Sequence, residues 1–250
     1  MNGYALRCGD CLDVMKTLPT GVVDMILADP PYGTTACKWD SVILFEPLWE
    51  QYKRVIKKNG AIVLFAQTPF DKVLGCSNLP MLRYEFIWEK TEATGHLNAK
   101  KAPMKAHENL LVFYSAYPTY NPQKTHGHQR KTAMNVDRAT KQSDCYGAQD
   151  GITHYDSTER YPRSVLLFST DKQKSTLHPT QKPVALCEYM ISTYTNEGDT
   201  VLDNCMGSGT TGIACANLGR RFIGIEKDGE YFQIAKERIT AAYRAKSEVA

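Results

Sequence analysis

The run Val22-Val23-Asp24-Met25-Ile26-Leu27-Ala28 leads directly into Asp29-Pro30-Pro31-Tyr32. The first part is short and mostly apolar, which predicts a buried strand. Because two prolines cannot continue a central strand, the chain must turn out of the sheet at this point. The tetrapeptide then lies at the carboxyl end of a strand, the edge where open α/β sheets bind ligands. A strand that merely ends in a proline turn is the plain alternative for this stretch taken alone.

The turn offers two hydrogen-bond acceptors beside an aromatic ring. The Asp29 carboxylate and the Pro30 carbonyl, which has no neighbouring N–H because Pro31 follows, suit the two hydrogens of a planar exocyclic amine. Tyr32 can stack on the ring that carries such an amine. Asp29, Pro30, Pro31 and Tyr32 are therefore the candidate catalytic residues.

Strand and helix patterns alternate along most of the chain, which predicts a doubly wound α/β sheet. Two β-rich runs, 81–88 and 109–114, predict an antiparallel edge and hence a mixed sheet. From 117 to 175 the periodicity is lost over too great a length for a simple loop, so we predict an insertion there. The expected strands are 4–8, 22–28, 61–66, 199–203 and 221–226, and the expected helices are 11–18, 44–57, 70–78, 182–194, 210–218 and 229–244.

Composition sets broad limits on the class of protein. The 250 residues, 42% of them hydrophobic, can bury one good core, and no apolar run approaches membrane-spanning length. No signal-peptide core precedes the first expected strand, and the eight cysteines show no disulfide rhythm, so we expect a reduced, cytoplasmic protein. A net charge of +3 is too small to imply nucleic acid by itself.

A second candidate site follows the expected strand 199–203. Gly207, Gly209 and Gly212 form a G-x-G-x-x-G turn, and Glu226 closes the next strand. A triphosphate would need a lysine that this turn lacks, and a dinucleotide pyrophosphate would be repelled by the Asp203 carboxylate at the strand tip. The same carboxylate suits the ammonium and sulfonium charges of S-adenosylmethionine, with Glu226 accepting the ribose hydroxyls, although NAD stays as the alternative ligand.

At this point the chain resembles the amino-methyltransferases of DNA, in the permuted arrangement called the beta class. In that family the turn that occurs here as Asp29–Tyr32 comes first, a target-recognition segment follows, and the cofactor loop, here Asp203–Gly212, comes last. The His178-Pro179-Thr180-Gln181-Lys182-Pro183 run is another family mark. Cys8-Gly9-Asp10-Cys11 and His107-Glu108-Asn109 are similar to further family segments. The resemblance covers nearly the whole chain outside 117–174.

The resemblance implies a Rossmann-like methyltransferase fold that is circularly permuted and carries an inserted target-recognition region. It implies two halves of one core, 1–116 and 176–250, with the recognition region at 117–175 between them. In the family the acidic residue after the first strand lies near the adenine of the cofactor, and the His178–Pro183 run contacts its methionine end. The implied S-adenosylmethionine residues are Asp10, Cys11, Asp29, His178, Thr180, Gln181, Lys182, Asp203, Cys205, Gly207, Ser208, Gly209, Thr210, Thr211 and Glu226.

The implied activity is transfer of a methyl group to an amine of a base in duplex DNA. Because that amine is buried in the stack, the base must be flipped out, and Tyr32 would stack on it. In the family an aspartate at the first motif position usually accompanies adenine N6, so adenine is expected and cytosine N4 stays open. Methylation of RNA or of a protein amide stays open too, as does an inactive DNA-binding relative. A phage, prophage or restriction-modification enzyme fits the short chain, with a homodimer and a cognate restriction endonuclease left open as partners.

Basic residues gather between the two candidate sites. From Lys90 to Lys131 there are seven basic residues against two acidic ones, a balance that suits phosphate contacts, although such a run is often only a solvated face. Trp39 lies in the loop after the catalytic turn, where a flipped base would pass. The residues expected to contact DNA are Trp39, Lys100, Lys101, Lys105, Lys124, Arg130 and Lys131.

No metal site is expected. Cys8 and Cys11 could be half of a zinc site or a redox dithiol, and His126 and His128 could be recruited, but the spacing does not favour a metal. These cysteines are more readily explained as packing beside the cofactor. The H-x-E and P-C-x-x-C signature of zinc nucleobase deaminases is absent, which excludes that class.

Overall fold

The computed structural model describes residues 3–33, 41–135, 153–169 and 181–249. It divides into two compact units, the first formed by Met1–Asn121 with Ser164–Ala250 and the second by Pro122–Arg163. Each unit is described by itself. In the described part of the chain no helix combines the length and the apolar character that crossing a membrane requires.

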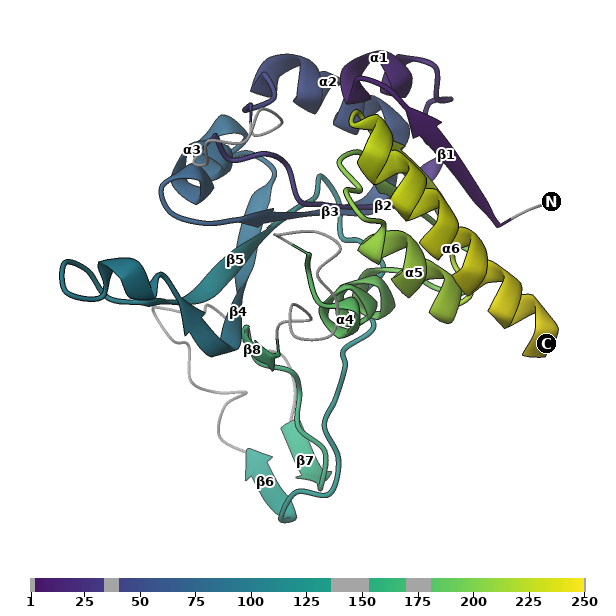
Figure 1. Cartoon of the computed structure of the whole chain (residues 1–250). Coiled ribbons are helices and arrows are strands. Elements are labelled where there is room, and N and C mark those ends of the chain that lie inside the picture. Colours follow the sequence, from purple (N-terminus) through teal and green to yellow (C-terminus); the bar gives the residue numbers. More distant parts are fainter. Residues whose placement is uncertain (1–2, 34–40, 136–152, 170–180, 250) are drawn as a thin grey trace. The chain divides into compact units, whose positions relative to one another are not determined.

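An eight-stranded mixed sheet forms the centre of the first unit (Figure 1). Five neighbouring strands run parallel, β5 and β4 add antiparallel pairs, and β8 pairs parallel with β4 at the far edge. The predicted doubly wound α/β sheet with an antiparallel portion is therefore confirmed. In spatial order the strands are β1 (Tyr4–Cys8), β10 (Arg221–Glu226), β9 (Thr200–Asp203), β2 (Val23–Ala28), β3 (Ile56–Ala66), β5 (Lys105–Phe113), β4 (Leu82–Thr94) and β8 (Val165–Phe168).

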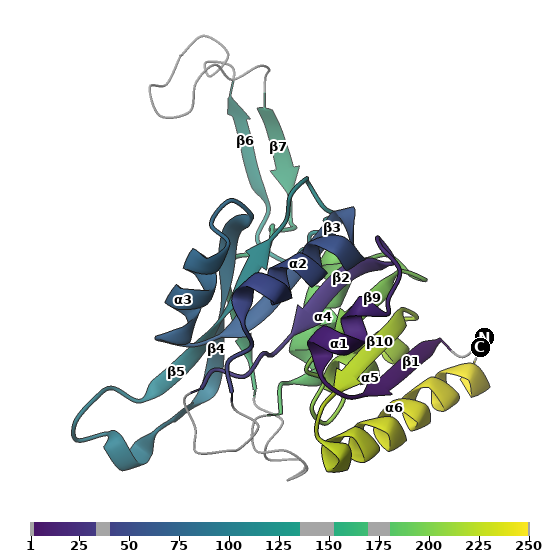
Figure 2. The ribbon, with the colours of Figure 1, turned by 90° about the horizontal axis from the view of Figure 1, so that it is seen from above.

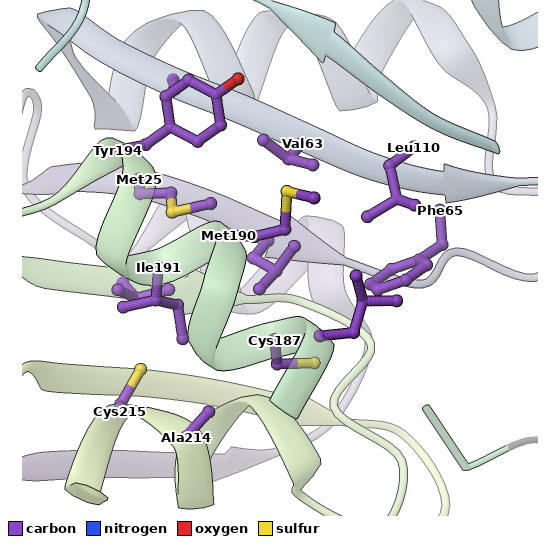
Figure 3. Packing of buried hydrophobic residues seen from close by; sticks show 14 of the residues in the cluster. Met25, Val63, Phe65, Leu110, Cys187, Met190, Ile191, Tyr194, Ala214 and Cys215 are labelled. Carbon is purple, nitrogen blue, oxygen red and sulfur yellow. The ribbon is translucent and has the colours of Figure 1, made fainter. Parts of the chain in front are cut away.

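Helices cover both faces of this sheet, and each face has its own apolar core. One core lies under α1 (Cys11–Lys16), α2 (Phe45–Val55) and α3 (Phe70–Ser77). The other lies under α4 (Val184–Tyr194), α5 (Thr210–Asn217) and α6 (Gly229–Val249). Strand residues alternate between the two cores: in β3, Val63 and Phe65 face α4, whereas Ile62 and Leu64 face the opposite helices. Figure 3 shows Met190 and Ile191 of α4 packed toward strand residues such as Met25 and Val63.

The direction of strand order reverses between β9 and β2. On one side of β2 lie β3, β5 and β4, in that spatial order, and on its other side lie β9, β10 and β1 (Figure 2). The two central strands are parallel neighbours, with Met25 opposite Val201 and Ile26 opposite Leu202. Such a reversal leaves a crevice at the carboxyl ends of the central strands, where ligands bind in open α/β sheets. Asp29 follows β2 and Asp203 ends β9, so both candidate sites meet at this crevice.

The predicted boundaries differ from the structure at several places, most clearly around β3 and in the two β-rich runs. The helix expected at 44–57 ends at Val55, and the chain is already extended from Ile56 as β3. The two β-rich runs form β4 and β5, which are longer than expected, extend to Thr94 and Lys105 and carry a short 3-10 turn, His96–Asn98, between them. These extensions lack the alternation of apolar and polar residues that predicts a strand. The hairpin is exposed there, so charged and polar residues occupy both of its faces.

The second unit holds an antiparallel pair, β6 (Lys131–Asn135) and β7 (Thr153–Ser157), and an isolated bridge between Thr125 and Arg160. The insertion was predicted to span 117–175, but the compact unit is Pro122–Arg163. Asn121 stays with the first unit because its side-chain amide donates to the Ser192 and Thr195 carbonyls. β8 also belongs to the central sheet, and its four residues are too few to give a clear periodicity after a polar stretch.

Helix packing explains one glycine of the glycine-rich turn, Gly212. A Cβ atom on Gly212 would lie 2.6 Å from Ile239 of α6 and 2.8 Å from Phe222 of β10. Both neighbours are buried, so they have little room to move. Gly212 is therefore explained by the close packing of α5 against α6.

We expect Gly212→Ala to destabilise the protein by about 1–3 kcal/mol, because the added methyl group overpacks this contact. Denaturant unfolding monitored by circular dichroism measures the change. Gly229→Ala is the matched control, since nothing lies within 4 Å of the position that its Cβ atom would take, and it should leave stability unchanged or slightly raised. Equal stability of the two variants would show that the α5–α6 contact tolerates a side chain.

Candidate active site

A cavity of about 660 Å³ opens at the carboxyl ends of the central strands, within the size range of small-molecule sites. The four residues of the proline turn line the cavity. Residues of the glycine loop and of the turn after β1 line it as well. Gly209 does not line it, and His178, Thr180 and Trp39 lie outside the described residues. The predicted residues that line the cavity are Asp10, Cys11, Asp29, Pro30, Pro31, Tyr32, Gln181, Lys182, Asp203, Cys205, Gly207, Ser208, Thr210, Thr211 and Glu226.

The Asp29 carboxylate is held by two donors. The Tyr32 hydroxyl donates to Oδ1 over 2.6 Å, and the Lys182 ammonium lies 2.7 Å from Oδ2. The Tyr32 ring also stacks on Phe70 of α3, with a centroid separation of 5.0 Å. Burial raises the pKa of Asp29 above its usual value, and the charge of Lys182 opposes that rise. The result is an oriented carboxylate at the tip of β2.

Lys182 joins Asp29 to a second buried ion pair. Its ammonium lies 3.2 Å from Oε2 of Glu108, and the ammonium of Lys90 lies 2.6 Å from Oε1 of the same carboxylate. Burial would lower the pKa of Lys182, but Asp29 and Glu108 raise it above its usual value. Burial would likewise raise the pKa of Glu108, but Lys182 and Lys90 hold it below its usual value. Lys182 and Glu108 are therefore held in their charged forms.

Sequence reasoning missed two members of this network. Lys90 belongs to the run of basic residues that suggested a charged surface, but only 8% of its side chain is exposed. Glu108 stood out only as part of a family segment. The alternation of side chains along a strand gave a signal for both residues. Lys90 lies two residues after the buried Trp88, and Glu108 lies two residues before the buried Leu110, so each shares a strand face with a buried residue. Trp88 and Glu108 are directly opposite in the ladder, which brings these faces together.

The glycine loop places Asp203 and Glu226 beside each other at the tips of β9 and β10. Only 4% of Asp203 is exposed; its Oδ1 accepts the Cys205 N–H over 3.0 Å, and the Thr211 hydroxyl also bonds to it. Burial raises the pKa of Asp203 to about 7. Glu226 accepts the Gly207 N–H at 2.9 Å and the Asp228 N–H at 2.8 Å, so it fixes the loop as well as facing the cavity.

The turn between β1 and α1 contributes a further part of the wall. Asp10 caps α1 by accepting the Leu12 N–H over 3.0 Å, and Lys227 lies 3.2 Å from its other oxygen. Cys11 is buried beside Cys205, and the hydrogen bond between the two thiols lowers the pKa of Cys11. Cys11 and Cys205 both line the cavity. Cys8, which was expected to pack beside the ligand together with Cys11, is exposed and is not among the residues that line the cavity.

Comparison with known proteins decides the family. Residues 23–237 match a family described as DNA methylase. The chain belongs to this family. The match runs from the strand before the proline turn to the last helix, so it includes Asp29 and Asp203.

Named relatives of this DNA methylase cover nearly its whole length. It is 30% identical to type II methyltransferase M.HpaI of Haemophilus parainfluenzae, over 95% of this chain and 74% of that protein. It is 31% identical to DNA adenine methyltransferase YhdJ of Escherichia coli (strain K12), over 94% of this chain and 82% of that protein. The crystal structure of an M1.HpyAVI–SAM complex superposes with a TM-score of 0.65 at 26% identity, covering 94% of this chain and 98% of that one.

The basic residues expected to contact DNA fall into two groups in the DNA methylase. Lys100 and Lys101 are exposed on the β4–β5 hairpin, and the Lys105 ammonium donates to the side-chain Oε1 of Gln67 over 3.4 Å. In the second unit, however, Lys124 pairs with Glu159 at 2.9 Å, and Arg130 makes two hydrogen bonds to Asp156. The expected excess of positive charge did not count these acids, because they lie beyond Lys131 in the sequence.

Proposed function

We propose that this protein transfers a methyl group from S-adenosylmethionine to the exocyclic N6 amine of adenine in duplex DNA. The observation that carries the proposal is the meeting of two carboxylates, Asp29 and Asp203, in one cavity at the tips of adjacent parallel strands. Family membership supports DNA as the substrate. The name of the YhdJ relative supports adenine as the target base.

The cavity fits the charge of S-adenosylmethionine. Asp203 is buried and forms no ion pair within the described residues, and its raised pKa reflects that environment. Oε1 of Gln181, also buried and facing the cavity, has no hydrogen-bond donor among the described residues. A ligand with an ammonium group supplies both the charge and the donors that these acceptors need. We assign the ribose hydroxyls to Glu226, which ends the next strand and lines the cavity, and the adenine to the wall that contains Asp10 and Cys11.

Bound S-adenosylmethionine supplies an electrophilic methyl group, and the protein residues position the amine that receives it. The Asp29 carboxylate and the Pro30 carbonyl accept the two hydrogens of the amine, which favours a tetrahedral nitrogen with its lone pair aimed at the methyl carbon. Tyr32 stacks on the flipped base and holds its plane. Because both partners are fixed in one cavity, orientation supplies much of the rate gain, and no covalent bond to the protein is needed.

Cofactor binding is the first test of this proposal. Isothermal titration should show one molecule of S-adenosylmethionine bound per chain, with NAD binding more weakly by tenfold or more. Incubation with tritiated S-adenosylmethionine and duplex DNA should then transfer label to the DNA. Label transfer to RNA or protein and not to DNA, or tighter binding of NAD, would contradict the proposal.

We further propose that exposed lysines on the β4–β5 hairpin contact DNA phosphates, together with Lys131, and that the second unit carries sequence recognition. The base of this hairpin, at Glu92, Ala93 and Thr94, lines the cavity. Lys100 and Lys101 follow it and are exposed. Lys124 and Arg130 would have to exchange their carboxylate partners for phosphates, which reduces their expected contribution.

Replacing Lys100 and Lys101 together by alanine should weaken DNA binding for all sequences. The slope of log K against log salt should fall by roughly one unit for each phosphate that the protein no longer neutralises. Fluorescence anisotropy across a salt series measures this slope. The control is the double replacement of Lys236 and Lys246, which removes the same charge from exposed positions on α6. Equal salt slopes for the two double variants would mean that the hairpin lysines are only solvated.

A further inference from the structure

Four charged side chains share one buried space at the tip of β2. Asp29 and Glu108 are the acids, and Lys182 and Lys90 are the bases. Their side chains are 25%, 12%, 10% and 8% exposed, in that order. Two positive and two negative charges balance, which reduces the cost of removing them from water.

Asp29 alone with Lys182 would be a weak acceptor. A buried lysine 2.7 Å from a carboxylate cancels much of its charge, and the Tyr32 hydroxyl already occupies the other oxygen. An amine must nevertheless form a hydrogen bond with this carboxylate for Asp29 to act as proposed. Something therefore has to draw the lysine charge away from Asp29 without letting the carboxylate move.

Glu108 is placed to do this. Its Oε2 atom is buried and has no donor in hydrogen-bonding geometry among the described residues, although Lys182 Nζ lies only 3.2 Å away. The same ammonium is 2.7 Å from Asp29, so a small shift of Lys182 Nζ toward Glu108 moves both its charge and a hydrogen bond from one acid to the other. Lys90 holds the opposite oxygen of Glu108 at 2.6 Å and keeps that acceptor in place.

We propose that Glu108 is a positioning residue for methyl transfer, sharing the Lys182 ammonium with Asp29 so that Asp29 is oriented without being neutralised. When the target amine enters, Lys182 turns toward Glu108, and Asp29 Oδ2 accepts the amine. Lys182 thus acts on the catalytic carboxylate, whereas the sequence suggested a cofactor contact for it. The inference rests on the proposed function, because it assigns a role within that reaction.

Glu108→Gln tests the proposal because it removes the charge and nearly keeps the shape. We expect kcat, measured with saturating DNA and S-adenosylmethionine, to fall on the order of tenfold, the size of one charge-assisted hydrogen bond. Affinities for DNA and for S-adenosylmethionine should stay within about twofold, a range well below a tenfold effect. Glu89→Gln is the matched control, an exposed glutamate on β4 that should keep wild-type kcat.

The pH profile separates positioning from a merely structural role. The groups that face Asp29 are Lys182 before α4, Glu108 on β5, Tyr32 in its own turn and Asp203 on β9. The negative charge of Glu108 raises the pKa of Asp29, so its removal lowers that pKa. The acidic limb of kcat should therefore move to lower pH in Glu108→Gln.

A double variant separates a loss of activity from a loss of folding. Glu108→Gln leaves the buried Lys90 ammonium without its carboxylate, and Lys90→Met with Glu108→Gln removes that charge too. The double variant should unfold cooperatively near the wild-type temperature and still show the reduced kcat. Wild-type kcat in the double variant, or an unmoved acidic limb in Glu108→Gln, overturns the inference while the proposed function stands. A wild-type protein that methylates no adenine overturns both.

Discussion

Asp29→Ala is expected to lower the rate of methyl transfer by on the order of a hundredfold or more, because it removes the carboxylate that we propose orients the target amine. The fold should persist, since Lys182 keeps Glu108 as its partner at 3.2 Å. Removing a carboxylate whose pKa is raised by burial also removes a desolvation cost at neutral pH. Affinity for S-adenosylmethionine should change little, because Asp203 and Glu226 remain.

Single-turnover transfer of tritiated methyl groups to DNA measures this loss, and calorimetry measures cofactor affinity beside it. Asp29→Asn is the informative companion, because it keeps one carbonyl acceptor and should retain more activity than the alanine variant. Turnover within a few-fold of wild type in Asp29→Ala would show that Asp29 is not the catalytic acceptor.

Asp203→Asn is expected to weaken S-adenosylmethionine binding by about tenfold or more and to stabilise the free protein. The loss of affinity follows from removing a charged partner worth roughly 1.5–3 kcal/mol. The asparagine side chain can still accept the hydrogen bonds that Asp203 accepts from Cys205 and Thr211. Function and stability should therefore change in opposite directions at this residue.

The stability change has a defined pH dependence. Burial raises the pKa of Asp203 from 3.8 to about 7, so the folded protein binds the proton more tightly than the unfolded chain. The free energy of unfolding of the wild type therefore falls, through this group, as the pH rises from about 4 to about 7. Asp203→Asn should be more stable than wild type by roughly 1–2 kcal/mol at pH 8 and equal to it at pH 3.5.

Denaturant unfolding at pH 8 and at lower pH, without cofactor, measures this difference. Asp13→Asn is the control, an aspartate with 76% of its side chain exposed, and it should not be more stable than wild type at pH 8. Lower stability of Asp203→Asn at pH 8, or unchanged affinity for S-adenosylmethionine, would contradict the assignment of Asp203.

The fold was predictable where strands are short and buried on both faces. The run that ends at Ala28 and the strand Arg221–Glu226 were expected within a residue of their bounds, because apolar runs bounded by Pro, Gly or Asp leave few alternatives. β8 was missed because a four-residue strand with exposed Val165 and Leu167 gives little periodic signal. Its place beside β4 depends on tertiary pairing, which local sequence does not encode.

The candidate site was predictable where a motif stands at a strand tip, as with Asp29 and Asp203. The other two members of the ion network around Asp29 were harder to predict, because they come from two different strands. Lys90 and Glu108 are 18 residues apart and meet only through the β4–β5 ladder. Composition placed Lys90 on a basic surface, whereas the pairing of the two strands places it in a buried ion network.

Nucleoside analysis distinguishes methylation of adenine N6 in DNA from methylation of cytosine N4. Duplex DNA containing all four bases is incubated with S-adenosylmethionine and the wild-type protein, digested to nucleosides, and separated by liquid chromatography with mass spectrometry. We expect N6-methyldeoxyadenosine with the wild-type protein and its near absence with Asp29→Ala. N4-methyldeoxycytidine as the sole product, or the same adenine product from Asp29→Ala, would contradict transfer to adenine N6 through Asp29.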